Sequence, residues 1–433
     1  MRRHIPDLLR ANRPFRDYWT GQTISLFGDQ IALLAIPLLA ILTLHADARQ
    51  MGLLAAAELA PCLFFAVHLG AWADRRRSRR AILVGADLGR AALLLGLPLA
   101  AVFGVLTMPI LYVVAFATGT LSVLFMVAEQ TVFTSLVKPV DYVEANSLLI
   151  GSRSLAVVGG KTIGGLLVAA LTAPVAIAVD GFTFLASAFF VRRADVPEPP
   201  AAAADSGGLA AGIRFVRRTP LLRASLLGTA TFNLFNTAFW ALLVLFATEE
   251  LGLGSGAIGI ALGVGALGSI IGSACARSVN ARIGLGNALI ASFVLAPLPL
   301  VLVPLSSGPP GLTMALLTLA EFGAGIGVMI LEVALGSLQA AIIPDQLRSR
   351  VWGAILFVNW GVRPLGALGA GFVAGAIGLR STMWIAAIGA MAGVLWVLPS
   401  RLSEVRDVDA DGLTVAPGRP AEAEDAPRVP VEV

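Results

Sequence analysis

Long apolar runs separated by short charged segments constrain this chain more than any other feature. Most runs hold about 20 or more residues, the length that an α-helix needs to cross roughly 30 Å of hydrocarbon. Each run is predicted to be a helix, because lipid cannot satisfy open backbone groups and the alternation typical of barrel strands is absent. The twelve predicted helices cover residues 18–44, 50–73, 81–104, 109–135, 147–172, 174–191, 221–248, 253–276, 286–306, 311–340, 350–376 and 380–399.

Composition agrees with a polytopic membrane protein. Apolar residues make up 57% of the 433 positions and charged residues only 13%. The net charge of +4 is too small to indicate nucleic-acid binding. Cys62 and Cys275 lie within apolar runs and are predicted to pack as small side chains. The basic N-terminus lacks a cleavage site for a signal peptide.

No sequence pattern points to an enzyme. The glycine-rich segments do not form a phosphate loop, because no strand precedes them and no Lys-Ser or Lys-Thr pair closes them. His4, His45 and His68 are scattered, and neither a catalytic triad nor a metal-ligand cluster can be delimited. We therefore expect no catalytic activity, no metal and no cofactor.

The distribution of Lys and Arg predicts the orientation. If the N-terminus is cytoplasmic, 25 of the 31 basic residues fall on the cytoplasmic side. The densest group lies in GAWADRRRSRR, Gly70 to Arg80, between the second and third predicted helices. Cytoplasmic loops of membrane proteins carry an excess of Lys and Arg. Both termini are therefore predicted to be cytoplasmic, in the inner (cytoplasmic) membrane of a bacterium.

A Pro/Ala/Gly-rich segment divides the chain into two halves of six helices. We expect a cytoplasmic tail over 1–17, an N-terminal bundle over 18–192, a linker over 193–219, a C-terminal bundle over 220–399 and a disordered cytoplasmic tail over 400–433. Part of the linker, residues 209–218, is suited to a short amphipathic helix. Glu129 and the Lys161 region match Glu332 and the Arg363 region, which favours duplication of a six-helix unit.

Four stretches carry a family resemblance. Gly70, Asp74, Arg75, Arg79 and Arg80 are spaced like the signature between helices 2 and 3 of the major facilitator superfamily, although Arg77 and Ser78 depart from it. The other stretches are FRDYWTGQTISLFGDQIALLAIPL, LVKPVDYVEANSLL and IIPDQLRSRVWGAILFVNWGVRPLGA. They resemble the transmembrane secretion effector branch, which includes enterobactin-exporter-like and macrolide-efflux-like proteins.

The resemblance implies an all-α polytopic membrane protein of the major facilitator fold, with twelve transmembrane helices in two pseudo-symmetric six-helix bundles. It also implies an exporter of the drug:proton antiporter type, with the substrate held between the halves and both halves rocking around it. Lys161 departs from the family, because a proline is usual at this position of helix 5 in proton antiporters.

Three acidic residues deep in the predicted helices are candidates for proton coupling. Asp29, Glu321 and Glu58 lie roughly 9 to 11 residues from the nearer helix end. Charged groups at that depth are costly and often functional. Asp29 ranks first, because helix 1 lines the cavity in the resembling family. Burial favours the neutral form of a carboxyl group, which suits proton uptake and release. A structural hydrogen bond is the alternative for Asp29 and Glu321, and for Glu58 the alternative is a polar neighbour for the helix kink at Pro61.

Other polar residues are candidates for the substrate cavity or for a cytoplasmic latch. Lys161 and Arg363 are suited to an anionic group of the substrate or to a structural ion pair. The cavity candidates are Gln30, Lys161, Asn233, Asn236, Trp240 and Arg363. A latch that joins and releases the halves is predicted from Gly70, Asp74, Arg75, Arg79, Arg80, Asp87, Arg90 and Glu129.

The sequence thus predicts a secondary active exporter of an amphipathic small molecule, either drug-like, macrolide-like or siderophore-like, that works by alternating access and proton antiport. A uniporter or importer of an organic anion that uses Lys161 and Arg363 is an alternative. A membrane scaffold or receptor that transports nothing is another. The expected partners are the lipid bilayer, the substrate and protons, without nucleic acid, and we expect a monomer.

Overall fold

The N-terminal half is a bundle of six long helices. The computed structural model describes residues 6–74, 76, 78–195, 208–409 and 412–415. In the N-terminal half, a short helix α1 (Asp7–Ala11) precedes α2 (Arg13–Leu44), α3 (Ala48–Asp74), α4 (Arg79–Val102), α5 (Met108–Leu136), the 3-10 turn η1 (Pro139–Asp141), α6 (Tyr142–Ala170) and α7 (Ala173–Arg193). Asn12 caps α2 by accepting a hydrogen bond from Phe15 N (3.0 Å), and Ser78 caps α4 in the same way.

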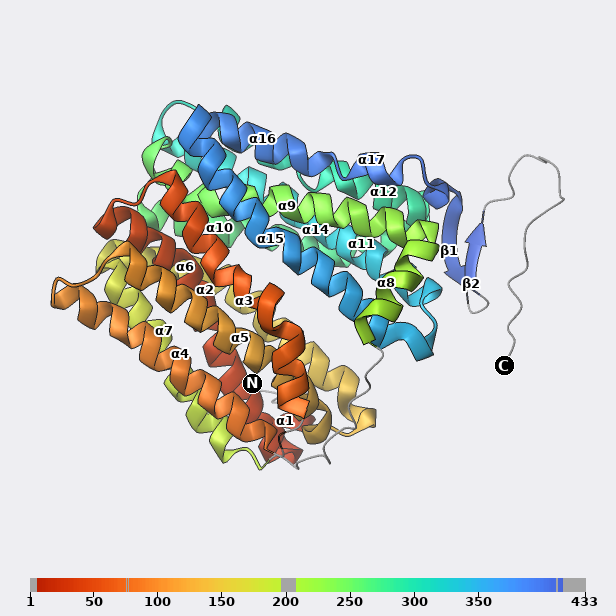
Figure 1. Ribbon diagram of the computed structural model, residues 1–433, viewed down its shortest axis with the longest axis horizontal. Helices are drawn as coiled ribbons and strands as arrows, with labels where there is room; N and C mark the ends of the chain where they lie inside the picture. Colours follow the sequence, from red (N-terminus) through yellow and green to blue (C-terminus); the bar gives the residue numbers. More distant parts are fainter. Residues whose placement is uncertain (1–5, 75, 77, 196–207, 410–411, 416–433) are drawn as a thin grey trace, which may run out of the picture.

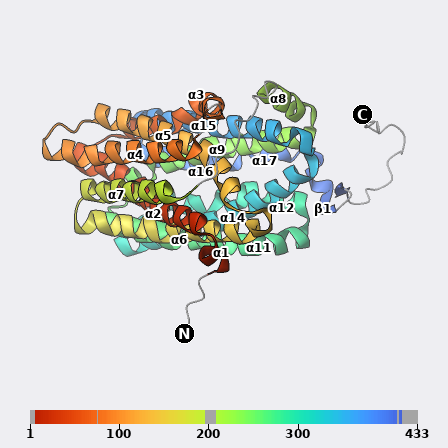
Figure 2. The same ribbon diagram turned by 90° about the horizontal axis from the view of Figure 1, so that it is seen from below.

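The C-terminal half repeats this bundle with more interruptions. Its elements are α8 (Gly208–Arg218), α9 (Pro220–Glu249), α10 (Ser255–Gly265), α11 (Leu267–Ile283), α12 (Leu285–Leu295), η2 (Leu298–Val301), α13 (Leu302–Leu305), α14 (Pro310–Ile342), η3 (Asp345–Leu347), α15 (Arg348–Ile377), α16 (Leu379–Met391) and α17 (Val394–Val397). Figure 1 shows the two halves as separate groups of helices, and Figure 2 shows the long helices running roughly parallel or antiparallel.

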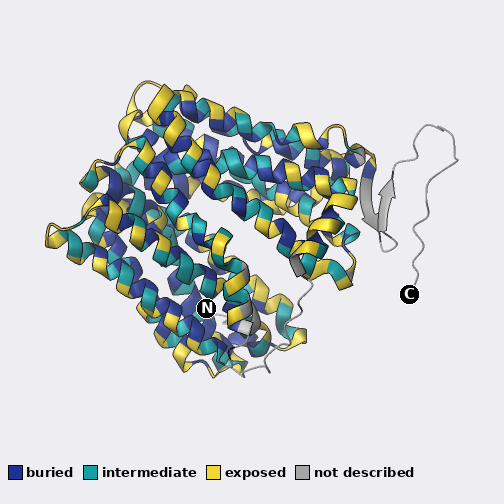
Figure 3. Cartoon of the chain, viewed as in Figure 1, coloured by how far each residue is buried: buried dark blue, intermediate teal, exposed yellow. Residues whose placement is uncertain are grey.

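The prediction of a twelve-helix membrane protein is confirmed. In the described part of the chain, 11 helical segments are long and apolar enough to cross a membrane. Helix α3, with 27 residues, supplies the twelfth. Many large apolar side chains are exposed, as expected for contact with lipid, and Figure 3 shows exposed residues in yellow along the outer helices. Examples are Leu99, Val113, Leu155, Phe182 and Phe372.

Three predicted helices are interrupted in the structure. The run predicted over 253–276 breaks at Ala266 between α10 and α11 and continues to Ile283. The run over 286–306 divides into α12, η2 and α13, because three prolines at 297, 299 and 304 lack a backbone N–H. The run over 380–399 breaks near Gly393, whose backbone packs closely against Gly228 of α9.

The end of the chain differs from the prediction of a disordered tail from residue 400. Residues Arg401–Glu404 form a 3-10 turn, η4. Two short antiparallel strands follow, β1 (Val405–Asp409) and β2 (Gly412–Val415). Leu402 and Val405 are buried in the core of the C-terminal half, and the backbone of Leu402 lies against Gly286. Apolar contacts therefore order this segment, and residues 416–433 lie outside the described part.

Among the described residues, the halves share a hydrophobic core at one end and not at the other. We call the face on which α2, α4, α6, α9, α12 and α15 begin the basic face, because arginines 79, 80, 192, 193, 217, 218, 348 and 350 lie there. Near the opposite face, one cluster of buried residues contains side chains of both halves. They include side chains of α2 in the N-terminal half and of α9, α10, α14 and α15 in the C-terminal half. Near the basic face, each half has its own cluster. The halves are therefore packed together at the opposite face and separate toward the basic face (Figure 1).

Two glycine crossings bring the halves into backbone contact. At the crossing of α3 with α15, a Cβ atom added to Gly52 would lie 2.6 Å from the Ala367 carbonyl oxygen and 2.8 Å from Gly371 Cα. At the crossing of α6 with α10, a Cβ atom on Gly165 would lie 2.6 Å from Gly259 Cα. Both crossings lie near the opposite face, and small residues allow this close approach between membrane helices.

Candidate functional site

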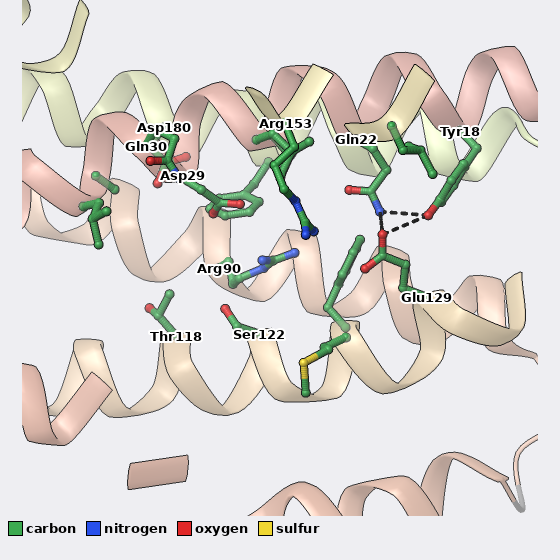
Figure 4. Close-up of a pocket in the computed structure, with 18 of the residues that line it drawn as sticks. Tyr18, Gln22, Asp29, Gln30, Arg90, Thr118, Ser122, Glu129, Arg153 and Asp180 are labelled. Atoms are coloured by element: carbon green, nitrogen blue, oxygen red, sulfur yellow. Dashed lines mark hydrogen bonds between the residues drawn. The ribbon is translucent and has the colours of Figure 1, made fainter. Parts of the chain in front are cut away.

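A large cavity with charged walls lies inside the N-terminal half. It has a volume of about 780 Å³ and extends from the middle of α2 toward the basic face. We call it the polar cavity. Its polar lining residues are Tyr18, Gln22, Ser25, Asp29, Gln30, Glu58, Arg90, Thr118, Ser122, Glu129, Asn146, Arg153 and Asp180. Figure 4 shows labelled side chains of this set pointing into the space between the helices.

Glu129 belongs to a hydrogen-bonded group on the wall of the polar cavity. The Tyr18 hydroxyl donates to Glu129 Oε1 (3.0 Å), and Gln22 Nε2 donates to the same oxygen (3.1 Å). Gln22 also donates to the Tyr18 hydroxyl oxygen (3.3 Å). Figure 4 shows these bonds as dashed lines. The sequence predicts Glu129 in a latch between the halves, whereas in the structure its carboxylate accepts hydrogen bonds from α2 of its own half.

A buried ion pair between Asp87 and Arg90 supports the same wall. The Arg90 guanidinium donates to Asp87 Oδ1, and both side chains are almost fully buried. The guanidinium also lies 4.1 Å from the ring centroid of Phe184 and 4.6 Å from that of Phe125. These i, i+3 neighbours, which the sequence placed in the latch, therefore pair with each other within α4, and Arg90 lines the polar cavity.

The Asp87–Arg90 pair yields a prediction on stability. Arg90→Leu leaves the Asp87 carboxylate buried without its partner, which costs about 3–5 kcal/mol in protein interiors. We expect a clearly lower melting temperature of the purified protein in detergent. Arg16→Gln is the control, because the Arg16–Asp17 pair is exposed at Arg16 and longer, at 4.0 Å. Equal melting temperatures for both variants would contradict this role.

A second cavity lies between the two halves. It has a volume of about 390 Å³ and is lined mainly by apolar residues of α2, α3 and α9. We call it the interface cavity. Its polar and aromatic lining residues are Glu58, Lys161, Asn236, Thr237, Trp240 and Arg363. Leu33, Ile36 and Glu58 line both cavities, so the two cavities meet at these residues.

The cations of the interface cavity are held by aromatic and amide groups. Lys161 Nζ lies 4.8 Å from the ring centroid of Trp240. Arg363 donates to Asn233 Oδ1 from Nη2 (2.9 Å) and Nε (3.2 Å), and its guanidinium lies 4.4 Å from the Trp360 ring centroid. Neither cation has a carboxylate within 4.0 Å in the described part of the chain. Both remain available to an anionic or aromatic ligand.

Glu321 lies apart from both cavities. It is buried on α14 against Gly265, at the break between α10 and α11. Its Oε1 atom has no hydrogen-bond partner among the described residues. The opposite charges of Glu321 and Lys161 attract one another, although the two side chains form no ion pair. Glu321 can thus influence the interface cavity through Lys161 without lining it.

The predicted latch residues are only partly described. The side chain of Asp74 and all of Arg75 lie outside the described part. Gly70 lies on α3, and Arg79 is buried at the start of α4. Arg80 donates to the Ala194 carbonyl oxygen (3.1 Å), so it ties α4 to the end of α7 within one half.

Two charged residues of the polar cavity were not predicted as part of a site. Arg153 on α6 is exposed to the cavity, and Asp180 on α7 is fully buried at its wall. Asp180 is the one acidic residue of the apolar run over 174–191, but it lies only six residues from the nearer end of that run, so the depth criterion that selected Asp29 passes it over. No group of three or more His, Cys, Asp or Glu in the described residues could hold a metal ion.

Comparison with known proteins identifies the family. The sequence matches the transmembrane secretion effector family over residues 9–433. The chain belongs to this family. It is a multi-pass transporter of the major facilitator superfamily, not an enzyme.

Proteins that are similar to this transporter agree with its assignment to the family. YfiS, an MFS-type transporter of Bacillus subtilis (strain 168), is 25% identical over 415 residues, which cover 92% of this chain and 96% of YfiS. The multidrug efflux pump Tap of Mycolicibacterium fortuitum is 27% identical over 400 residues, 87% of this chain and 93% of Tap. A bacterial homologue of the iron transporter ferroportin, solved in an inward-facing state, shares the fold at a TM-score of 0.72 and 14% identity, covering 90% of this chain and 98% of the homologue.

Proposed function

We propose that this transporter exports an amphipathic small molecule from the bacterial cytoplasm in exchange for protons. The observation that carries the proposal is the junction of the two cavities at Glu58. One cavity offers carboxylates for protons, and the other offers an apolar and aromatic surface for an organic molecule. The similarity to the multidrug efflux pump Tap supports the direction of transport.

The basic face is cytoplasmic in this proposal, with both termini inside. The positive-inside rule supports that orientation. The described conformation is then inward-facing, because the shared core and the glycine crossings close the opposite face. Rocking of the halves around the interface cavity would open the opposite face and close the basic face.

An efflux assay tests the proposal. Cells of a bacterial host that lacks its own multidrug pumps are loaded with ethidium or fluorescein, and dye loss is followed with and without the transporter. We expect faster loss of at least one dye, and this difference should vanish when a protonophore collapses the proton gradient. Equal loss of every dye in a broad amphipathic panel, with the protein present in the membrane, would contradict export.

Trp240 supplies a prediction on substrate binding. Trp240→Ala removes a ring that lines the interface cavity and lies beside Lys161. Since a buried aromatic contact contributes about 1 kcal/mol or more, we expect roughly tenfold weaker binding of the transported dye. Fluorescence titration of the purified protein measures this. Trp396→Ala is the control, because Trp396 lies on α17, outside the two cavities. Unchanged affinity in Trp240→Ala would contradict the assignment.

A second candidate function keeps the fold and changes the direction. Lys161 and Arg363 line the interface cavity without an acidic partner in the described residues, which favours uptake or facilitated diffusion of an organic anion. In this case fluorescein, and not ethidium, should move through the protein, and a protonophore should leave its movement unchanged.

A further inference from the structure

Asp180 on α7 is a buried carboxylate without a complete set of partners. The side chain is 0% exposed. The Thr183 hydroxyl lies 3.0 Å from Asp180 Oδ1, whereas Oδ2 has no hydrogen-bond partner among the described residues. A buried carboxylate oxygen without a partner is costly. A ligand that supplies a hydrogen bond to this oxygen would remove that cost.

The carboxyl group of Asp180 lies against α2 beside Asp29. A Cβ atom added to Gly28 would collide with Asp180 Oδ1 and with Thr183 Oγ1. Gly28 immediately precedes Asp29, so the glycine makes room for Asp180 at this position of α2. Both carboxyl groups line the polar cavity, and Figure 4 shows them in the same part of it. Their negative charges repel one another.

The cations around the two carboxyl groups do not form ion pairs with them. Helices α2, α4 and α6 pack against α7, and their charged groups here are Asp29, Asp87, Arg90 and Arg153. Glu58 of α3 and Glu129 of α5 line the same cavity, and their charges repel that of Asp29. Arg90 attracts both carboxylates, but its ion pair is with Asp87. Arg153 forms no ion pair with a described residue. A proton is the smallest ligand that would reduce the repulsion between Asp29 and Asp180.

We propose that Asp29 and Asp180 bind one proton between them, and that this shared proton is the coupling ion of the transporter. The proton comes from water in the polar cavity and forms an O–H bond on one carboxyl group, which donates to an oxygen of the other. The pair then carries one negative charge instead of two. Two carboxylates that share a buried site hold such a proton as a unit. The inference rests on the proposed antiport and names its proton site.

Infrared difference spectroscopy tests the shared site without substrate or gradient. Spectra of the full-length protein in detergent are compared between acidic and alkaline buffer, and the carbonyl band of a protonated carboxyl group is followed. We expect Asp29→Asn and Asp180→Asn to lose the same band. The control Glu249→Gln should keep it, because Glu249 is exposed at the end of α9. Retention of the wild-type band in Asp180→Asn would overturn the proposal.

A second variant separates loss of the proton site from loss of the fold. Asp180→Glu keeps a carboxyl group at this position, so it should show a protonated carboxyl band at a shifted frequency. Size-exclusion chromatography compares the state of all variants. A folded Asp180→Glu protein without any such band would overturn the proposal.

Transport in vesicles separates this inference from the proposed function. For whichever of ethidium and fluorescein the wild type transports, Asp180→Asn should lose gradient-driven accumulation and keep dye exchange at equal pH. Accumulation at the wild-type rate would overturn the shared site. If the wild type itself shows no response to the gradient, antiport fails, whereas the infrared comparison still decides whether the two carboxyl groups share a proton.

Discussion

Replacing Asp29 with asparagine is expected to abolish proton-driven export while the protein remains folded in the membrane. Asparagine has nearly the same size and stays polar, but it cannot take up and release a proton. Asp29 lines the polar cavity on α2, close to the junction with the interface cavity at Glu58. We expect dye accumulation in vesicles with an imposed pH gradient to fall to the level of vesicles without protein.

The control variant for Asp29→Asn replaces a carboxylate that lines neither cavity. Glu249→Gln should accumulate dye at the wild-type rate, because Glu249 is exposed at the opposite face. Unchanged accumulation in Asp29→Asn would contradict the assigned role. The same assay on Glu58→Gln and Glu321→Gln would then decide between the two remaining candidates.

Enlarging a glycine at a crossing between the halves is expected to open the face that is closed here. In Gly371→Leu, the new side chain meets the backbone of α3, since even a Cβ atom would lie 2.8 Å from the Ala48 carbonyl oxygen. The two helices must then move apart near the opposite face. This raises the free energy of the described conformation relative to the conformation in which the cavity opens at the opposite face. We expect export to fall to near zero, because the halves cannot close again.

Cysteine labelling measures this shift. Ala241 lines the interface cavity, so Ala241→Cys in a variant without Cys62 and Cys275 reports access to it. With Gly371→Leu, a membrane-impermeant maleimide should label this cysteine more from the outside and less from the cytoplasmic side. Gly369→Leu is the matched control on the same helix, because a Cβ atom there has no neighbour within 4 Å. Identical labelling of both variants would contradict the proposal that the crossing of α3 with α15 controls access from the opposite face.

The positions of the long helices along the chain could be predicted from the sequence, because a segment that crosses lipid must be long enough and apolar enough. The charged segment from Gly70 to Arg80 marked the boundary between α3 and α4, and α8 formed where its amphipathic pattern predicted a helix. The breaks in α10–α11 and α16–α17 were missed. They depend on close packing of Gly265 against α14 and of Gly393 against α9, which periodicity does not encode.

Depth in the helices selected three acidic residues, of which Asp29 and Glu58 line a cavity and Glu321 lies apart from both cavities. Lys161, Trp240 and Arg363 lie together in the interface cavity. The partners depend on which helix faces which. Arg363 bonds with the amide of Asn233 instead of an acid, Glu129 accepts a hydrogen bond from Tyr18, and Asp180 packs against α2 at Gly28.

Simultaneous recording of dye and proton movement in vesicles of purified transporter decides whether the protein is an antiporter. A pH indicator and a transported dye are followed at once after a pH gradient is imposed across the membrane. We expect dye to accumulate against its concentration gradient while protons move the opposite way, and we expect Asp29→Asn to stop both movements. Dye accumulation without any proton movement linked to the protein would contradict proton antiport through this cavity.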